Sequence, residues 1–290
     1  MENVIELNLS SRRWQVLQPA IYLISILPGL VWGFLLPPTI SKWALGFTTL
    51  SVVLIQHGVN VFNDVIDWKK GADSEKQLSW VRFHDLNLSV AQLHGWVSFV
   101  AGVSLGSSLV IAYQRFEVFY VALPLVLLGY GYNASQWTLS YTALGEWVTA
   151  LCYGPGVFGC MGYLLTGTVT WSHILGSLGF AFLSVSVLFS HQPPQILNDF
   201  LAGKLSFAVR NGAEKTKRIA QVFHSISLLL LTGIFFQFEN TLWNFILVWT
   251  LAGLWALRAY KIPPTPKTIL NSALMWVLGS LILKLLGVFS

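Results

Sequence analysis

Long apolar runs separated by shorter polar stretches recur along the whole chain. Several of them approach or exceed the roughly 20 apolar residues that a helix needs to cross a bilayer. A spanning segment must satisfy its own backbone hydrogen bonds, so these runs are expected to be helices. The pattern predicts nine spans, at about 17–36, 43–65, 93–113, 117–134, 144–167, 173–192, 219–237, 241–258 and 268–289. Residues 1–290 are therefore expected to form one all-α, polytopic membrane domain.

Composition agrees with this interpretation. The chain is 54% hydrophobic and 10% charged, with a mean hydropathy of +0.64, whereas soluble domains average roughly 45–50% apolar and 25% charged residues. The first run is too long for a secretory signal and lacks a small-residue cleavage site, so the first span is expected to remain. Both cysteines, Cys152 and Cys160, fall in one apolar run, which favours small buried side chains over a disulfide.

Basic residues gather in the loops that share a side with the N terminus. These residues are Arg12, Arg13, Lys69, Lys70, Lys76, Arg82, Lys204, Arg210, Lys215, Lys217, Arg218, Arg258, Lys261 and Lys267. Only Lys42, Arg115 and Lys284 fall on the other side. The positive-inside rule then predicts an N-in, C-out orientation. Topology and anionic lipid headgroups account for the net charge of +5, so no nucleic-acid partner is inferred.

The stretch NVFNDVIDWKKGAD, residues 60–73, places carboxylates at the end of the second apolar run. A continuing helix would bring Asn60, Asp64 and Asp67 onto one face and make Asn63 a neighbour of Asp67. Carboxylates this close and partly desolvated need a compensating cation. Their hard oxygens suit Mg²⁺, which keeps several waters and commonly bridges to a substrate phosphate. A solvated helix end is the alternative for any single aspartate.

Other polar groups near this stretch allow two interpretations each. Gly71 frees the backbone, so Asp73 either bends back toward the other acids or faces water. Five basic side chains could meet phosphate oxygens or could serve only as topological charges; they are Lys69, Lys70, Arg82, Lys204 and Arg210. The second long loop opens with SHQPPQILNDFLAGKLSFAVRNG, residues 190–212, in which Asp199 is the only acid.

Three blocks of this sequence resemble the UbiA superfamily of intramembrane prenyltransferases, and most of all its 1,4-dihydroxy-2-naphthoate branch. The first block matches the family motif through Asn60, Asn63, Asp64, Asp67, Lys70, Gly71 and Asp73. The middle block is similar through Tyr132, Leu139, Tyr141, Leu144, Gly145, Glu146, Gly154 and Pro155. The third supplies Gln192, Pro194, Asp199, Gly203, Lys204, Ser206, Val209, Arg210 and Gly212. It departs from the family at Gln195, where the first aspartate of a second acidic motif is common.

The resemblance implies helices around a central cavity, in which two acidic motifs hold Mg²⁺ bridging an allylic diphosphate. It implies transfer of a polyprenyl group to an aromatic acceptor, 1,4-dihydroxy-2-naphthoate in this branch, for menaquinone biosynthesis at the bacterial cytoplasmic membrane. The catalytic and metal-binding residues implied are Asp64, Asp67 and Asp199. The substrate-binding residues implied are Asn60, Asn63, Lys70, Asp73, Tyr132, Tyr141, Glu146, Gln192, Gln195, Lys204 and Arg210.

Gln195 keeps several alternatives open. Its carbonyl oxygen can still act as a ligand, but one negative charge is lost, which weakens metal binding; Asn198 is a possible auxiliary donor. The chain could be active with a modified metal site, active on an unusual substrate or acceptor, or a non-catalytic homologue. A transporter is the rival class, because intramembrane acids also mark ion pathways. Against it, these acids lie at helix ends and not near the midplane.

Histidines offer candidate bases for the proton that an attacking aromatic ring loses. Only His57, one turn before Asn60, and His191, beside Gln192, lie near the motifs. Packing within the helices is the alternative role for both. The other four have no chemical context in the sequence; they are His84, His94, His173 and His224.

Overall fold

The computed structural model describes residues 15–37, 39–72, 76, 78–133, 138–235 and 242–285, and no strand occurs within these ranges. The longer elements are α2 (Leu23–Leu35), α3 (Lys42–Lys69), α5 (Leu88–Ala112), α6 (Val118–Asn133), α9 (Trp171–His191), α12 (Ala213–Phe235), α13 (Leu242–Lys261) and α14 (Pro266–Leu285). One further run consists of α7 (Gly145–Leu151), the π-helix η3 (Cys152–Gly159) and α8 (Cys160–Thr166). The short elements are η1 (Pro19–Tyr22), α4 (Trp80–Phe83), η2 (Leu139–Tyr141), η4 (Pro193–Gln195), α10 (Ile196–Leu201) and α11 (Phe207–Asn211).

All nine predicted spans fall on helices of the structure, and the fifth is the composite run α7–η3–α8. In the described part of the chain, 7 helical segments are long and apolar enough to cross a membrane. The shorter α6 is also apolar, and α13 is not among the seven. An all-helical membrane bundle is therefore confirmed, while the count of nine spans and the N-in orientation stay predictions.

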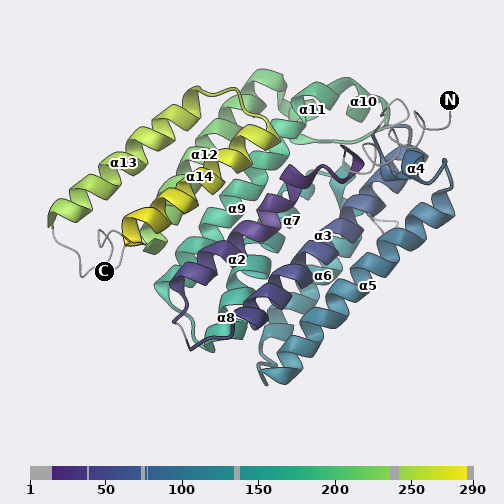
Figure 1. Ribbon diagram of the computed structural model, residues 1–290. Helices are drawn as coiled ribbons and strands as arrows, with labels where there is room; N and C mark the ends of the chain where they lie inside the picture. Colours follow the sequence, from purple (N-terminus) through teal and green to yellow (C-terminus); the bar gives the residue numbers. More distant parts are fainter. Residues whose placement is uncertain are drawn as a thin grey trace, which may run out of the picture.

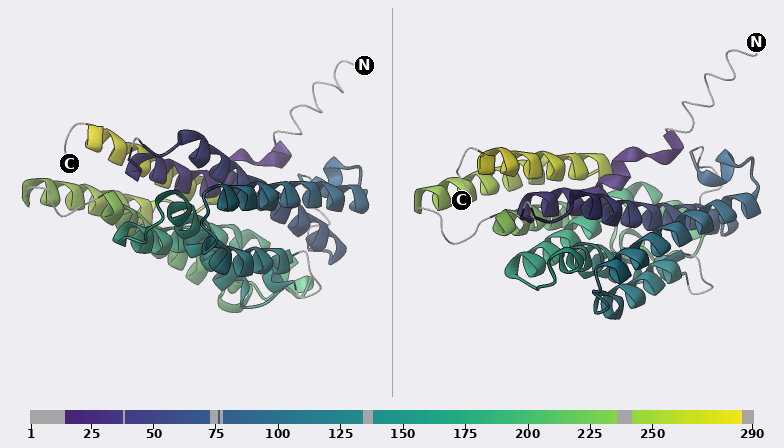
Figure 2. Two further views of the ribbon diagram at one scale, coloured as in Figure 1. Left: turned by 90° about the horizontal axis from the view of Figure 1, so that it is seen from below. Right: turned by 60° about the horizontal axis from the view of Figure 1, so that its bottom comes forward.

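The long helices run side by side in two stacked layers (Figures 1 and 2). One layer runs from α14 through α2 and α3 to α5, and each of these helices packs against the next. The other runs from α13 through α12 and α9 to η3 and α6. Helices α4, α10 and α11 lie at one end of the bundle (Figure 1), which we call the site end.

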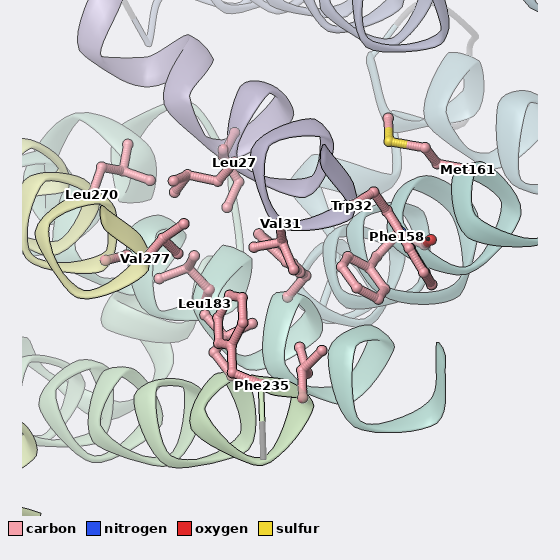
Figure 3. Packing of buried hydrophobic residues seen from close by; sticks show 14 of the residues in the cluster. Leu27, Val31, Trp32, Phe158, Met161, Leu183, Phe235, Leu270 and Val277 are labelled. Carbon is pink, nitrogen blue, oxygen red and sulfur yellow. Dashed lines mark hydrogen bonds between the residues drawn. The ribbon is translucent and has the colours of Figure 1, made fainter. Parts of the chain in front are cut away.

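The main apolar core lies where the two layers meet (Figure 3). Trp32 of α2 stacks on Phe158 of η3 with 4.9 Å between ring centroids, and its indole N–H donates to the Phe158 carbonyl at 3.0 Å. Gly176 of α9 faces the Phe158 ring, and a Cβ there would lie 2.0 Å from that ring. This close packing joins α2, η3 and α9 into a fixed frame behind the site end.

Small residues bring α3 and α5 into close contact. A Cβ at Gly58 would lie 2.7 Å from the Gly95 carbonyl oxygen, and one at Gly102 would lie 2.7 Å from the Ser51 carbonyl oxygen. The Ser51 hydroxyl also donates to the Gly102 carbonyl at 2.7 Å. Small side chains let helix backbones approach closely in membranes, where polar contacts add to packing. This contact holds the final turns of α3, which carry the acidic motif.

Helix boundaries at the site end differ from those predicted. The loop expected at 66–92 begins later, because α3 continues to Lys69 and ends before Gly71, whose φ of 80° suits glycine. The loop expected at 193–218 contains η4, α10 and α11, and α12 begins at Ala213 instead of 219. Polar residues lowered the hydropathy of these turns, but their side chains have partners within the fold.

Candidate active site

Asp67 lies at the centre of a polar cluster at the site end and is only 3% exposed. Its carboxylate accepts hydrogen bonds from the Tyr141 hydroxyl at 2.7 Å and from the Asn63 amide at 2.9 Å. The contact between Asn63 and Asp67, one helical turn apart, confirms the neighbouring positions predicted from their spacing. A buried carboxylate with several donors is held in one orientation.

Lys204 joins the two sequence blocks that carry acids. Its ammonium lies 3.2 Å from Asp67 and 3.9 Å from Asp199, a buried residue of α10. Gly203, with a φ of 73°, turns the chain just before this lysine. Burial lowers the pKa of Lys204, but the two facing carboxylates outweigh burial, and the pKa stands above its ordinary value. A charged ammonium therefore sits between carboxylates that are 132 residues apart in the chain.

Lys70 and Tyr141 complete the same cluster. The Lys70 ammonium lies 3.8 Å from the Tyr141 ring centroid, a cation–π distance, and donates to the Thr138 hydroxyl at 2.9 Å. Burial lowers the pKa of Lys70, Asp67 raises it and Lys204 lowers it, with a net decrease. The ring of Tyr132 of α6 lies close to Gly145, where α7 begins. Two ammonium groups around one tyrosine form a place where an anion can be held.

Asp64 lies one turn earlier on α3 and has different partners. Its carboxylate pairs with Lys76 at 2.7 Å and accepts from the Trp80 backbone N–H at 2.7 Å. Asn60 lies one further turn back on α3 and is partly buried. Asp64 thus contacts α4 and the segment before it, whereas Asp67 contacts η2 and the loop after α10.

The remaining predicted residues fix the loop that carries Lys204. Glu146, at the start of α7, pairs with Arg210 at 3.0 Å. Its second carboxylate oxygen is buried and accepts no hydrogen bond from the described residues. The Gln192 side chain accepts from the backbone of Ala208 at 3.1 Å and so tethers α11. Leu205 N–H donates to the Tyr141 carbonyl at 3.0 Å, which joins this loop to η2.

Three predicted positions do not join this cluster through described contacts. Gln195 ends η4 with a partly buried side chain that makes no hydrogen bond to the described residues, and Asn198 is exposed on α10. Asp73 lies outside the described residues. The bent-back and the solvent-facing alternatives for Asp73 therefore both stay open.

The donors at the site end fit magnesium chemically. Among the described residues, no group of at least three His, Cys, Asp or Glu side chains converges closely enough to hold a metal ion alone. Mg²⁺ does not require such a group, because it is usually held by one or two carboxylates together with waters and substrate phosphates. Asp64, Asp67 and Asp199 are all buried carboxylates at this end of the bundle. Their role as metal ligands stays a prediction.

Sequence reasoning missed several residues of the site. Asn133 donates to the Asn63 amide oxygen and accepts a hydrogen bond from Ser140, which links α6 and η2 to α3. Lys76 was counted only as a loop charge, although it pairs with Asp64. These partners come from segments distant in sequence, and nothing in the local pattern pointed to them.

The fold and this polar cluster define an integral membrane protein in which buried acids, together with lysines that contact them, gather at one end of a helical bundle. The model of the UbiA prenyltransferase family matches residues 22–279, and the chain belongs to that family.

Named relatives and one solved structure agree with this assignment. The chain is 26% identical over 249 residues to a 2-carboxy-1,4-naphthoquinone phytyltransferase of Synechocystis sp., covering 84% of this chain and 80% of the relative. It is 22% identical over 239 residues to the 1,4-dihydroxy-2-naphthoate octaprenyltransferase of Bacillus subtilis, covering 80% and 76%. The fold matches a UbiA homolog from Archaeoglobus fulgidus, solved bound to DMAPP and Mg²⁺, with a TM-score of 0.64 and 18% identity over 93% and 97% of the two chains.

Proposed function

We propose that this protein transfers a polyprenyl group from an allylic diphosphate to an aromatic acceptor of the 1,4-dihydroxy-2-naphthoate type, with the assistance of Mg²⁺. One observation carries the proposal: Lys204 lies between Asp67 and Asp199, so both acidic blocks and a cation meet at one buried place. The naphthoate and naphthoquinone substrates in the names of the relatives support the choice of acceptor. The proposed setting is the bacterial cytoplasmic membrane, with the site end inside, and the pathway is menaquinone biosynthesis.

The residues of the cluster divide into two roles in this reaction. The ammonium groups of Lys204 and Lys70 bind oxygens of the diphosphate and stabilise the charge that develops as it departs. Tyr141 and Asn63 hold Asp67 in place. When bound, magnesium supplies Lewis-acid stabilisation of the departing diphosphate and would be held by Asp64, Asp67 and Asp199.

The allylic carbon becomes electron-poor as its bond to oxygen breaks, and the acceptor ring attacks it. Water must be kept away from this carbon, because water would capture it first. Aromatic faces such as those of Tyr132 and Tyr141 also favour positive charge near them. One buried oxygen of Glu146 has no hydrogen-bond partner among the described residues, so it can accept a hydrogen bond from an acceptor hydroxyl.

Removal of magnesium tests the proposed function. We expect membranes that contain the protein to form a prenylated naphthalene product from a labelled allylic diphosphate and 1,4-dihydroxy-2-naphthoate, and to lose this activity when a chelator is added. Several chain lengths and acceptors should be assayed in one screen. Full activity in the presence of the chelator would contradict the metal assignment. Solute flux across proteoliposomes, with no product from any acceptor, would favour a transporter.

Gln195→Asp tests the altered acidic block. We expect this variant to keep or raise activity and to reach half-maximal activity at a lower Mg²⁺ concentration, because a carboxylate binds Mg²⁺ more strongly than an amide oxygen does. The measurement is a Mg²⁺ titration of initial rates. The control for added charge is Asn87→Asp, because Asn87 is exposed at the start of α5 and an aspartate keeps its capping role there. A large loss of activity would show that the amide of Gln195 has a role of its own.

A further inference from the structure

Four ionisable side chains form an unbroken row beside the polar cluster. The Tyr22 hydroxyl lies 2.6 Å from His57 Nδ1. His57 Nε2 lies 3.1 Å from His94 Nε2, and His94 Nδ1 lies 3.1 Å from His84 Nε2. These residues come from η1, α3, α5 and the turn after α4, and we call them the histidine chain. Of these histidines, only His57 was a candidate base in the sequence, and His84 and His94 had no apparent partner there.

The atoms used in these contacts allow a proton to pass along the row. His57 and His94 each use both ring nitrogens within the chain. A neutral imidazole has one N–H donor and one acceptor nitrogen. One consistent arrangement therefore has Tyr22 donating to His57, His57 donating to His94, and His94 donating to His84. Each ring can accept a proton on one nitrogen while it releases one from the other.

Aromatic rings flank the chain. Trp80 packs with its ring centroid 4.9 Å from each of His57 and His94. Phe83 packs against His84 at 5.0 Å. The nitrogens follow one another in a row and do not surround a point, and the described residues hold no convergent group of three metal-ligating side chains. A metal site is therefore not what this arrangement offers.

The two ends of the chain lie in different surroundings. Tyr22 is 7% exposed, and its hydroxyl contacts His57, which lies about one turn of α3 before Asn60 and two turns before Asp64. His84 is only partly buried, in the turn after α4, next to the exposed Asp85. Burial lowers the pKa of His84 and Asp85 partly offsets this, so the ring is neutral near pH 7 and can accept a proton. The row thus leads from the acidic motif toward the surface.

We propose that Tyr22, His57, His94 and His84 form a proton relay that takes a proton from a hydroxyl of the aromatic acceptor and delivers it to water at His84. The proposal rests on the proposed function, because it assigns the base for that reaction. Tyr22 contacts the acceptor, so it is the catalytic residue, and the histidines act through it.

Bonds, electron pairs and protons balance when the relay operates together with prenyl transfer. The new carbon–carbon bond takes an electron pair from the acceptor ring, and the allylic carbon–oxygen bond breaks with its pair going to the diphosphate. The O–H pair of the acceptor becomes a carbonyl bond, and its proton passes to Tyr22 while Tyr22 passes its own proton to His57. The ring regains aromaticity when the substituted carbon loses its carboxylate as CO₂: the pair of the broken carbon–carbon bond re-forms the ring double bond, the carbonyl pair returns to the oxygen, and the same relay run in reverse protonates that oxygen.

Replacement of one relay member tests this role. His94→Gln keeps a donor and an acceptor in place, but an amide does not pass a proton through itself. General acid–base groups contribute typically 10²–10⁴-fold, so kcat should fall by about 10²-fold or more. KM for both substrates and the Mg²⁺ requirement should stay unchanged. His224→Gln is the matched control, because His224 is buried on α12 and bonds Ser272 outside the relay; it should keep the activity of the unmodified protein.

A second variant distinguishes a proton-relay role of these histidines from a role in packing alone. His57→Gln should lower kcat as His94→Gln does, and the double variant should lose no more than the worse single variant, because a row is already interrupted by one break. Imidazole added to His94→Ala should restore part of the activity.

The relay would be overturned if both single variants made normal product with a kcat within about threefold of that of the unmodified protein. The proposed function would then still stand. If the two reductions in kcat multiply in the double variant, His57 and His94 contribute through independent packing and not as members of a relay. Absence of product from the unmodified protein would remove the proposed function and the relay with it.

Discussion

Asp67→Asn is expected to lower kcat/KM for prenyl transfer by at least about 10²-fold, the scale on which removal of one preorganised electrostatic group acts. Asparagine has nearly the same shape and can still accept from the Tyr141 hydroxyl. The charge that attracts Lys204, and that would bind Mg²⁺, is lost. Asp67→Ala and Asp64→Ala should abolish the activity. The measurement is the initial rate of product formation over a range of Mg²⁺ and allylic diphosphate concentrations.

Glu214→Gln is the control for this loss, because it removes a carboxylate that lies exposed on α12 in a pair with Lys217. Its activity should equal that of the unmodified protein. If Asp67→Asn or Asp64→Ala were as active as this control, neither a metal site nor a charge at the acidic motif could be part of the reaction. A higher Mg²⁺ requirement with the same maximal rate would place Asp67 in metal binding alone.

Local patterns in the sequence predicted the bundle well, because a membrane leaves few alternatives to a helix. They predicted the end of α3 less well. Asp64, Asp67 and Lys69 lower the hydropathy of its last turns, yet the helix continues to Lys69 because Lys76, Tyr141 and Lys204 satisfy the two carboxylates. A hydropathy window does not contain that information, since these partners lie outside the helix.

The site could be predicted only where its contacts are local. The pair Asn63 and Asp67 follows from helical spacing and is present at 2.9 Å. The pair Lys204 and Asp67 joins positions 137 residues apart, and the histidine chain joins four separate elements. Such contacts depend on how helices pack; the glycines between α3 and α5, for example, allow the close approach that brings His57 beside His94. Residue types alone therefore identified the acids and several candidate cations, but not which of them pair.

Lys204→Met is expected to lower both activity and stability. Methionine fills much of the lysine volume but removes the ammonium that Asp67 and Asp199 share, and breaking a buried ion pair by removing one partner costs about 3–5 kcal/mol. The Tm in detergent without Mg²⁺ should therefore fall. Added Mg²⁺ should raise the Tm of the variant more than that of the unmodified protein, because the freed carboxylates bind the ion.

Lys217→Met is the control for this prediction. It removes an exposed lysine that pairs with Glu214, and it should change neither activity nor Tm. An equal Tm and an equal response to Mg²⁺ in Lys204→Met and Lys217→Met would mean that Lys204 does not link the acidic blocks. Lost activity at an unchanged Tm would confine this lysine to binding the diphosphate.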